Sequence, residues 1–303
     1  MVAGGGCMHL IEACRARFVC IPVVHEVTAG IAVEHFNECS PGARAFALVT
    51  TGPGLTNIVT AVASAWAQRR EMVVIAGQVK STDLLVPPLR QRGIQEVDGA
   101  AIVRPIAVRS ERLDRPIDRE EFLSILRAAR SPNPGPVVIE VCLDVQGARV
   151  RREPLEAPSA RVALAPAPSA AGVAGVEAVA AAARPLILLG GLVSRPTARA
   201  LLPALERLGV PVMTTTSAID RVPDRSPLAA GRPGTWGGQR SANLLVAQAD
   251  LLVALGARLD LQQTGFNWRE FAPGARIVQV YPCAAELAKG HPPLDVGHDA
   301  DPD

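Results

Sequence analysis

The sequence is poor in aromatic residues and in lysine, and it contains no long apolar run. Of its 303 residues only 3% are aromatic, and Lys80 and Lys289 are the only lysines. No apolar stretch approaches the roughly 18 residues that a membrane-spanning helix needs, and the N-terminus lacks the basic-then-apolar layout of a secretory signal. These absences argue against a membrane protein, and we expect the chain in the cytoplasm.

Paired cysteine motifs and an excess of charge are also absent. None of the six cysteines forms a Cys-x-x-Cys pair; they are Cys7, Cys14, Cys20, Cys39, Cys142 and Cys283. The first three are close enough in sequence to raise a metal or disulfide site, but their apolar setting favours buried free thiols in a reducing compartment. The formal net charge of +2 favours neither nucleic acid nor an acidic membrane surface as a partner.

Length and composition predict two globular domains. A hydrophobic content of 49% with 20% charged residues is typical of chains that form packed cores, and the length suits two domains of ordinary size. A stretch rich in Arg, Pro, Ala and Ser without periodicity is typical of a linker. We therefore expect a first domain at 1–148, a linker at 149–172, a second domain at 173–290 and a tail at 291–303.

Strand-like and helix-like segments alternate in both halves. The expected strands are 17–24, 45–50, 72–77 and 137–142 in the first half, then 185–189, 210–215, 251–255 and 277–281 in the second. The expected helices are 28–37, 56–69, 195–208 and 241–249. Such alternation predicts an α/β protein with two doubly wound parallel-sheet domains, joined by the Pro/Ala/Arg-rich linker.

One carboxylate has an unusual place in this pattern. Glu26 stands where an apolar segment runs into an Ala-rich helix, and a Gly-Pro-Gly turn opens a second helix after the next strand. A carboxylate in this place is partly withdrawn from water, which suits it to share a proton. The alternative interpretation is a solvated glutamate that complements the dipole of the helix start.

These blocks resemble the pyrimidine-binding domain of the thiamine-diphosphate-dependent enzymes, in particular the acetolactate synthase branch. A His-Glu pair precedes a small-residue helix there, as at His25 and Glu26, and residues 50–57 match the family turn Thr-(Ser/Thr)-Gly-Pro-Gly-x-x-Asn position by position. Further matches follow in order at 75–79, 93–98, 104–106, 135–140 and 143–146. The second half resembles the central domain of the same family at 209–212, 249–258 and 271–277.

The resemblance implies a role for individual residues. Glu26 would be catalytic, activating thiamine diphosphate through a hydrogen bond to the pyrimidine N1′. The cofactor-binding residues would be Thr50, Gly52, Pro53, Asn57 and Gln95, with glycine allowing the backbone close to a flat ring. The alternatives are an ordinary helix-opening turn and, for Gln95, a surface polar residue. His25 is interpreted as a packing histidine on the face opposite to Glu26.

The resemblance also sets expectations about what this chain does not supply. The family's third domain binds the cofactor diphosphate and Mg²⁺ through a Gly-Asp-Gly motif and a downstream Asn, and neither element occurs in this sequence. We therefore expect no metal ligands in this chain, a start about twenty residues later than in relatives, and a need for a homodimer or a chain carrying the diphosphate-binding domain. FAD is not expected, because relatives without flavin share the Gly190-Gly191 and Arg258 blocks.

The implied function is carbon–carbon lyase or synthase chemistry on a 2-oxo acid such as pyruvate, in a transferase or lyase of the acetolactate synthase type. Two alternatives stay open: a truncated, catalytically inactive family member, and a non-catalytic dimerising subunit. An intact Glu26 argues against long decay, whereas the missing ends argue for truncation. The sequence does not identify the acceptor.

Overall fold

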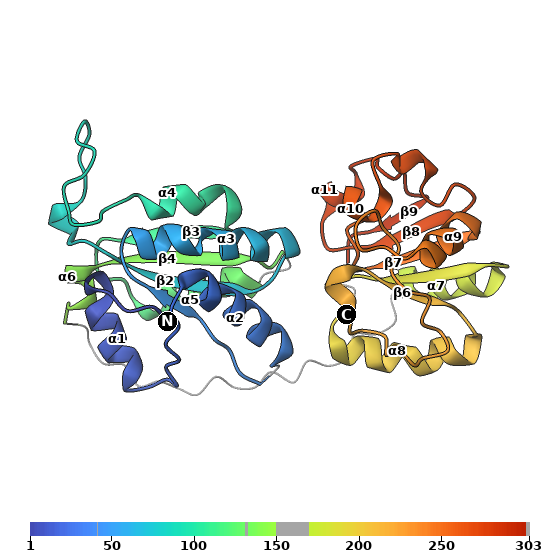
Figure 1. The fold of residues 1–303 in the computed structure, drawn as a ribbon, viewed down its shortest axis with the longest axis horizontal. Coiled ribbons are helices and arrows are strands. Elements are labelled where there is room, and N and C mark those ends of the chain that lie inside the picture. The colour runs from blue at the N-terminus through green and yellow to red at the C-terminus, as the bar shows by residue number, and fades with distance from the viewer. Residues whose placement is uncertain (41, 131–132, 150–169, 301–303) are drawn as a thin grey trace. The chain divides into compact units, whose positions relative to one another are not determined.

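The computed structural model divides the chain into two compact units, Met1–Ala157 and Pro158–Asp303. The structure describes residues 1–40, 42–130, 133–149 and 170–300. Each unit has its own sheet covered by helices (Figure 1). Most of the expected linker at 149–172 lies outside the described residues, and helix α7 (Ala170–Ala181) begins before the expected end of that linker.

The first unit contains a four-stranded sheet in which every neighbouring pair is parallel. The strand order is β1 (Ala47–Val49), β2 (Met72–Gln78), β4 (Pro136–Cys142) and β3 (Arg109–Leu113). The helices are α1 (Met8–Arg15), α2 (Glu26–Cys39), α3 (Pro53–Gln68), α4 (Gly99–Val103), α5 (Arg119–Arg127) and α6 (Leu143–Gln146). Short 3-10 turns accompany them: η1 (Gly5–Cys7), η2 (Ser81–Asp83), η3 (Arg104–Ile106) and η4 (Ala128–Arg130).

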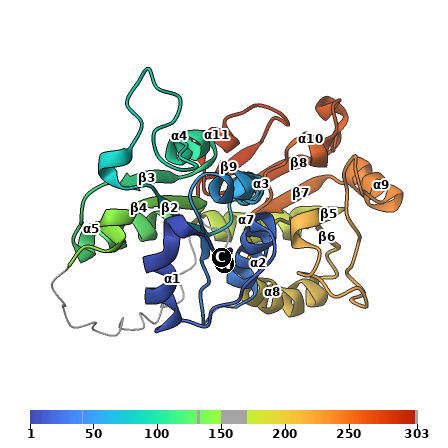
Figure 2. The same ribbon diagram turned by 60° about the vertical axis from the view of Figure 1, so that its left-hand side comes forward.

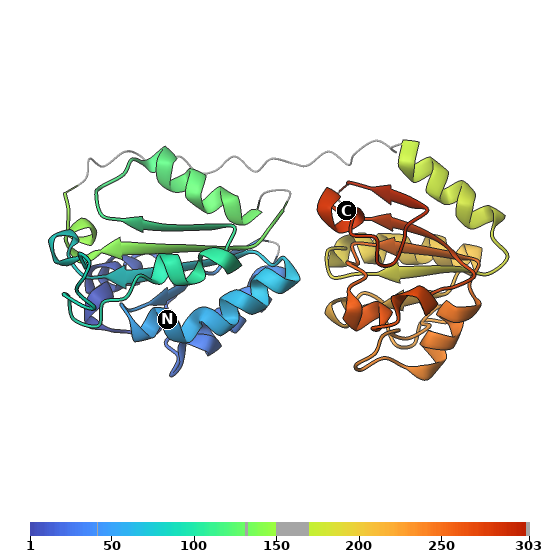
Figure 3. The same ribbon diagram turned by 90° about the horizontal axis from the view of Figure 1, so that it is seen from above.

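The sheet of the first unit has a separate apolar core on each face, because successive side chains of a strand point to opposite sides. Val138 of β4 packs with α2 and α3, whereas its neighbours Val137 and Ile139 pack with Ile125 of α5. Figure 3 shows α5 on one side of the sheet and α2 and α3 on the other. Since β4 is covered on both faces, its sequence is apolar almost throughout, as is typical of a central parallel strand.

The second unit repeats the architecture with a five-stranded parallel sheet. The strand order is β6 (Val212–Thr214), β5 (Pro185–Leu189), β7 (Leu251–Leu255), β8 (Arg276–Val280) and β9 (Val296–His298). The helices after α7 are α8 (Arg195–Leu208), α9 (Arg240–Gln248), α10 (Leu261–Thr264) and α11 (Ala284–Leu287), with 3-10 turns η5 (Thr216–Ala218) and η6 (Trp268–Glu270). Leu188 packs with α9, and Ile187 packs with α7 and α8 on the opposite face. The expected fold class is therefore confirmed for both units.

The strand expected at 17–24 is wrong. Helix α1 ends at Arg15, and the following segment has no strand partner among the described residues. Its apolar side chains Val19 and Val24 are 93% and 100% exposed. An apolar run indicates burial somewhere, but it does not show whether the backbone finds a neighbouring strand.

The sequence also missed two strands. β9 lies within the expected tail, yet it pairs with β8 at the edge of the second sheet. β3, with the sequence Arg-Ser-Glu-Arg-Leu, pairs with β4 although only Leu113 is buried. Both are edge strands, where backbone pairing does not require an apolar side-chain pattern. The expected helices and the other expected strands are present, with ends shifted by no more than about three residues.

Helices α2 and α3, which lead to the candidate site, approach each other through small residues. A Cβ built on Gly30 would collide with the Cβ of Ala61, and it would lie 3.2 Å from Cγ1 of Ile58. Glycine at this position therefore sets how closely the two helices pack.

We expect Gly30→Ala to lower the free energy of unfolding by about 1–2 kcal/mol, because overpacking outweighs the usual gain from alanine in a helix. Urea denaturation measures this change. The matched control is Gly175→Ala in α7, where no atom lies within 4 Å of the added Cβ; it should be neutral or stabilising. Equal stability of Gly30→Ala and the wild type would contradict the packing argument.

Candidate functional site

Glu26 is the first residue of α2, and only 7% of it is exposed. His25 caps the helix: its Nδ1 accepts a hydrogen bond from the N–H of Val27 at 3.2 Å. The side chain of His25 is exposed, so its interpretation as a packing histidine is wrong. The residue ahead of Glu26 is a helix cap and not part of a strand, which removes the alternation on which that interpretation depended.

Asn57 of α3 lies beside Glu26. Its Nδ2 donates a hydrogen bond to Oε2 of Glu26 at 3.0 Å. Glu26 stands in the first turn of α2, where unpaired N–H groups and the helix dipole favour a negative charge. The structure thus brings the predicted catalytic carboxylate and one predicted cofactor-binding residue into direct contact.

The turn before α3 brings together another predicted pair. Gly52 caps α3 with φ of +65°, in the left-handed region that favours glycine, and Pro53 occupies the first turn. A Cβ built on Gly52 would collide with the carbonyl oxygen of Gln95. The turn therefore touches the backbone of Gln95, a residue about forty positions away in sequence.

Gln95 itself has a strained backbone. Its φ is +57°, a conformation that costs a non-glycine residue roughly 1–2 kcal/mol. The side chain is exposed, and the described residues provide no hydrogen-bond partner for its amide. Glycine would adopt this backbone conformation without strain, and no described protein group bonds to the amide of Gln95. Both observations fit a side chain whose role is to bind a ligand.

Thr50 packs against the N-terminal glycines. Its Oγ1 accepts a hydrogen bond from the N–H of Gly6 at 3.3 Å. A Cβ on Gly4 would lie 2.5 Å from Cβ of Thr50, so the N-terminal glycines pack directly on this threonine. In the structure Thr50 holds η1 against the end of β1, and it contacts neither Glu26 nor Gln95 through a hydrogen bond of the described residues.

Glu96, which the sequence did not assign, ties together the two ends of a projecting loop. Its carboxylate accepts hydrogen bonds from the N–H groups of Leu85, of Arg92 at 3.2 Å and of Gly93 at 2.9 Å. Figures 1 and 2 show the segment between η2 and α4 extending away from the rest of the unit. Burial would raise the pKa of Glu96, but the bonds from Gly93, Leu85 and Arg92 outweigh it, so the pKa is lowered.

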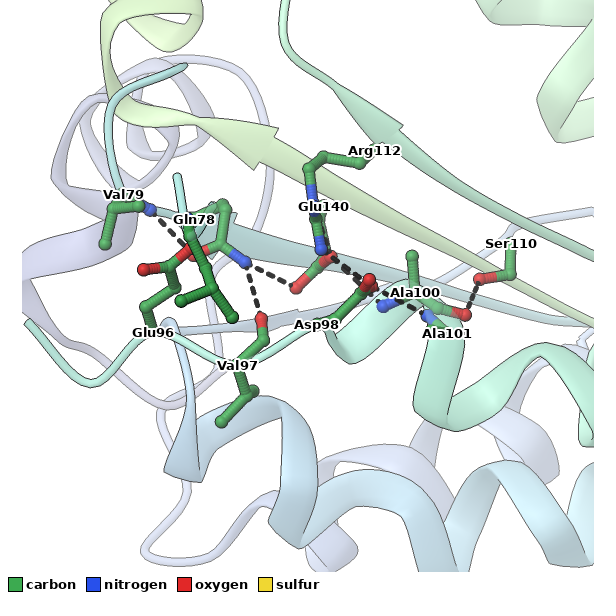
Figure 4. A network of polar contacts seen from close by, with 11 residues as sticks. Gln78, Val79, Glu96, Val97, Asp98, Ala100, Ala101, Ser110, Arg112 and Glu140 are labelled. Atoms are coloured by element: carbon green, nitrogen blue, oxygen red, sulfur yellow. Dashed lines mark hydrogen bonds and ion pairs between the residues drawn. The ribbon is translucent and has the colours of Figure 1, made fainter. Parts of the chain in front are cut away.

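A buried network holds the chain on the other side of Gln95 (Figure 4). Glu140 of β4 accepts a hydrogen bond from Nε2 of Gln78 at 2.9 Å and one from the N–H of Ala100 at 3.1 Å. Nε of Arg112 donates to the same carboxylate at 3.2 Å. Burial raises the pKa of Glu140, and Arg112 and the Ala100 N–H offset this only in part.

Glu140 and Gln78 leave a sequence signal: a glutamate inside the otherwise apolar β4, and a glutamine at the end of β2. A polar residue at a position buried on both faces needs partners, which marks such residues as structurally or functionally constrained. Both belong to the blocks that carry the family resemblance, but the sequence assigned no role to either.

The described residues offer neither a side-chain cluster for a metal ion nor a helix that could cross a membrane. No group of three or more His, Cys, Asp and Glu side chains in the described ranges could hold a metal ion. No described helix is long and apolar enough to cross a membrane.

Comparison with known families agrees with this geometry. Residues 1–102 match the N-terminal TPP binding domain of thiamine pyrophosphate enzymes, and residues 174–302 match the central domain of these enzymes. The chain belongs to the thiamine pyrophosphate enzymes, whose cofactor is thiamine diphosphate. The central-domain match extends through β9.

Within this family the chain is acetolactate synthase-like. It is 34% identical over 267 residues to the acetolactate synthase isozyme 1 large subunit of Escherichia coli K12, covering 88% of this chain and 46% of the relative. It is 31% identical over 272 residues to the probable acetolactate synthase large subunit of Methanocaldococcus jannaschii, with 88% and 45% covered. The sulfoacetaldehyde acetyltransferase of Rhodobacter capsulatus is 31% identical over 271 residues, with 88% and 44% covered. The chain spans less than half the length of these relatives.

Glu96→Gln tests how the loop is held. Because folding lowers the pKa of Glu96, the charged carboxylate contributes stability above its unfolded pKa, and this contribution is lost as the pH falls through the folded pKa. We expect the variant to be less stable than the wild type by about 1.5 kcal/mol at pH 7. In urea denaturation at a pH well below the ordinary pKa of glutamate the difference in stability should be smaller, because the wild-type carboxyl loses its charge as the pH falls through its folded pKa.

Glu120→Gln is the matched control, because Glu120 of α5 is exposed and pairs with Arg127 at 3.3 Å on the surface of the same unit. Its effect should stay below about 0.5 kcal/mol at both pH values. A difference in stability between Glu96→Gln and the wild type that does not depend on pH would show that the carboxylate charge does not hold the loop.

Proposed function

We propose that the first unit binds the aminopyrimidine of thiamine diphosphate, with Glu26 as the catalytic residue. The observation that carries this proposal is a buried carboxylate at a helix start, fixed by the amide of Asn57 and next to a glycine turn. The set of groups suits an aminopyrimidine: a carboxyl for a ring nitrogen, amides for its polar edge, and the exposed Pro53 of the glycine turn for its flat face.

Each residue has a separate task in this proposal. Glu26 shares a proton at the pyrimidine N1′, and its Oε1 is the oxygen that we assign to the ring, since Asn57 occupies Oε2. Gly52 and Pro53 form the surface on which the ring packs, and Gln95 offers its amide as a donor. Thr50 contributes indirectly, by holding η1. When bound, thiamine diphosphate supplies the carbon nucleophile and electron sink for making or breaking a bond beside a carbonyl.

A second polypeptide surface is part of the proposed site. Apolar side chains flank the two central residues: Val24 precedes the Glu26 helix and is fully exposed, and Ile94, next to Gln95, is 86% exposed. Exposed apolar side chains around a site indicate a surface that another chain covers. We propose a homodimer or a chain carrying a diphosphate-binding domain as this partner, with Mg²⁺ held by that domain.

The reaction that we propose is carbon–carbon lyase or synthase chemistry on a 2-oxo acid such as pyruvate. The names of the relatives, acetolactate synthases and an acetyltransferase, support this class and leave the acceptor open. An inactive family member or a dimerising subunit is the second candidate, because the hydrogen bond between Asn57 and Glu26 serves ligand binding without turnover equally well. For the compartment we propose the cytoplasm, which agrees with six free cysteines.

Titration with thiamine diphosphate plus Mg²⁺, and separately with the aminopyrimidine half of thiamine, tests the role of Glu26. We expect weak binding of both ligands, followed by ligand-detected NMR, and a loss of about tenfold in affinity in Glu26→Gln, because a hydrogen bond to a charged group is removed. Glu34→Gln is the matched control, since Glu34 is a buried glutamate of the same helix that lies outside the site. Equal affinities of the wild type and Glu26→Gln would overturn the proposal.

We further propose that the second unit does not hold FAD. Nucleotides bind in open parallel sheets where the strand order reverses, here at the ends of β5 and β7. The two loops at this point are bonded to each other: the Gly190 N–H donates to Leu255 O at 2.8 Å, and the Leu192 N–H donates to Gly256 O at 3.3 Å. Added FAD should therefore keep its fluorescence in the presence of the protein, and quenching that saturates would contradict this expectation.

A further inference from the structure

The position of Gln95 needs support from outside its own turn. Its left-handed backbone is strained, and a strained conformation persists only when the surrounding structure determines it. Glu96 ties the chain before Gln95, through Leu85, Arg92 and Gly93. The chain after Gln95 has a different support, which comes from the centre of the sheet.

This second support begins at Glu140, whose carboxylate is almost completely buried in β4. Oε1 accepts from Nε2 of Gln78, and the same Nε2 lies 2.9 Å from the carbonyl oxygen of Val97, to which it also donates. Oε2 accepts from the N–H of Ala100. Glu140 thus holds a carbonyl and an N–H of residues 97–100, one through Gln78 and one directly (Figure 4).

Arg112 of β3 joins the same segment to the carboxylate from the other side. Its Nε donates to Glu140, and its Nη2 donates to Oδ1 of Asp98 at 2.7 Å. Asp98 in turn caps α4, accepting from the N–H of Ala101 at 3.0 Å. The segment 97–101 is therefore held at several points by the buried carboxylate of Glu140 and by Arg112, the cation paired with it.

The close approach of this segment to Glu140 leaves no room for a side chain. A Cβ built on Gly99 would lie 2.6 Å from Oε1 of Glu140 and 2.5 Å from Cδ1 of Leu55 in α3. Gly99 is thus packed between the carboxylate and the helix that begins after Gly52. Any shift of residues 97–100 would move Gln95 relative to that turn.

We propose that Glu140 is a positioning residue that holds residues 97–100 on the sheet and thereby keeps Gln95 against Gly52. The inference depends on the proposed role of Gln95 in the site. It gives the buried glutamate of β4 a task in ligand binding, although Glu140 lies behind the segment and does not itself contact the turn. Gln78 and Arg112 act with it.

The charge of Glu140 favours such a role over a purely stabilising one. Burial raises its pKa, so the fold disfavours the ionised form, and the stability linked to this group falls as the pH rises through the folded pKa. A neutral amide of the same shape relieves that burial. Glu140→Gln keeps the shape of the side chain and removes its charge, and it replaces one acceptor oxygen by an NH₂ group that opposes a donor.

Hydrogen exchange in the full chain tests this separation between local and global effects. We expect Glu140→Gln to speed amide exchange at residues 95–101 about tenfold, because at least one charged hydrogen bond is lost. Exchange in β1 and in the second unit should stay unchanged. Gln78→Met, which keeps the side-chain length and removes the bonds to Val97 and Glu140, should speed exchange in the same residues. This second variant keeps the test decisive if Glu140→Gln does not fold.

Glu34→Gln is the control for burial, since Glu34 is also a buried glutamate whose pKa burial raises, and it should leave residues 95–101 unchanged. Affinity for the aminopyrimidine half of thiamine should fall about threefold or more in both network variants, without a matching loss of thermal stability. Faster exchange throughout the first unit, or unchanged exchange at 95–101, would overturn the proposal. If the wild type does not bind the pyrimidine, the proposed function fails. The exchange data still show whether Glu140 holds residues 97–100 on the sheet.

Discussion

The close contact between Gly52 and the backbone of Gln95 joins the parts of the candidate site. Gly52 caps the helix that carries Asn57, which donates to Glu26, so the turn, the amide and the carboxylate form one continuous group. Only a residue without a side chain, in a left-handed conformation, allows the two backbone segments to meet there. The other features of the first unit can be understood as means of keeping this contact in place.

Two carboxylates hold the segments on either side of Gln95, and their environments differ. Glu96 is surrounded by backbone N–H groups, which favour its charge and lower its pKa. Glu140 is buried in the sheet, and its partners offset the effect of burial on its pKa only in part. One therefore acts as a charged clamp at the base of a loop, and the other as a tether inside the core. Such supporting groups behind a site determine how accurately its functional side chains are placed.

The two units share the parallel-sheet architecture but differ in what lies at the ends of their strands. In the first unit the ends of the strands open onto a turn with an exposed amide and a buried carboxylate. In the second unit the loops after β5 and β7 are hydrogen-bonded to each other. The fold alone thus does not assign a function, and the functional proposal depends on the side chains at one set of strand ends.

The sequence by itself determined the fold class, most of the elements and the family, because apolar periodicity and short glycine motifs are local properties of the chain. It also predicted a site of Glu26, Thr50, Gly52, Pro53, Asn57 and Gln95, and the structure places Asn57 beside Glu26 and Gly52 against the backbone of Gln95. It did not determine that 17–24 has no strand partner in the part of the chain that the structure describes, that β3 and β9 pair at sheet edges, or that His25 is a helix cap. Those outcomes, like the tethers from Glu96 and Glu140, depend on which backbone groups meet across tens of residues, and only the tertiary structure decides that.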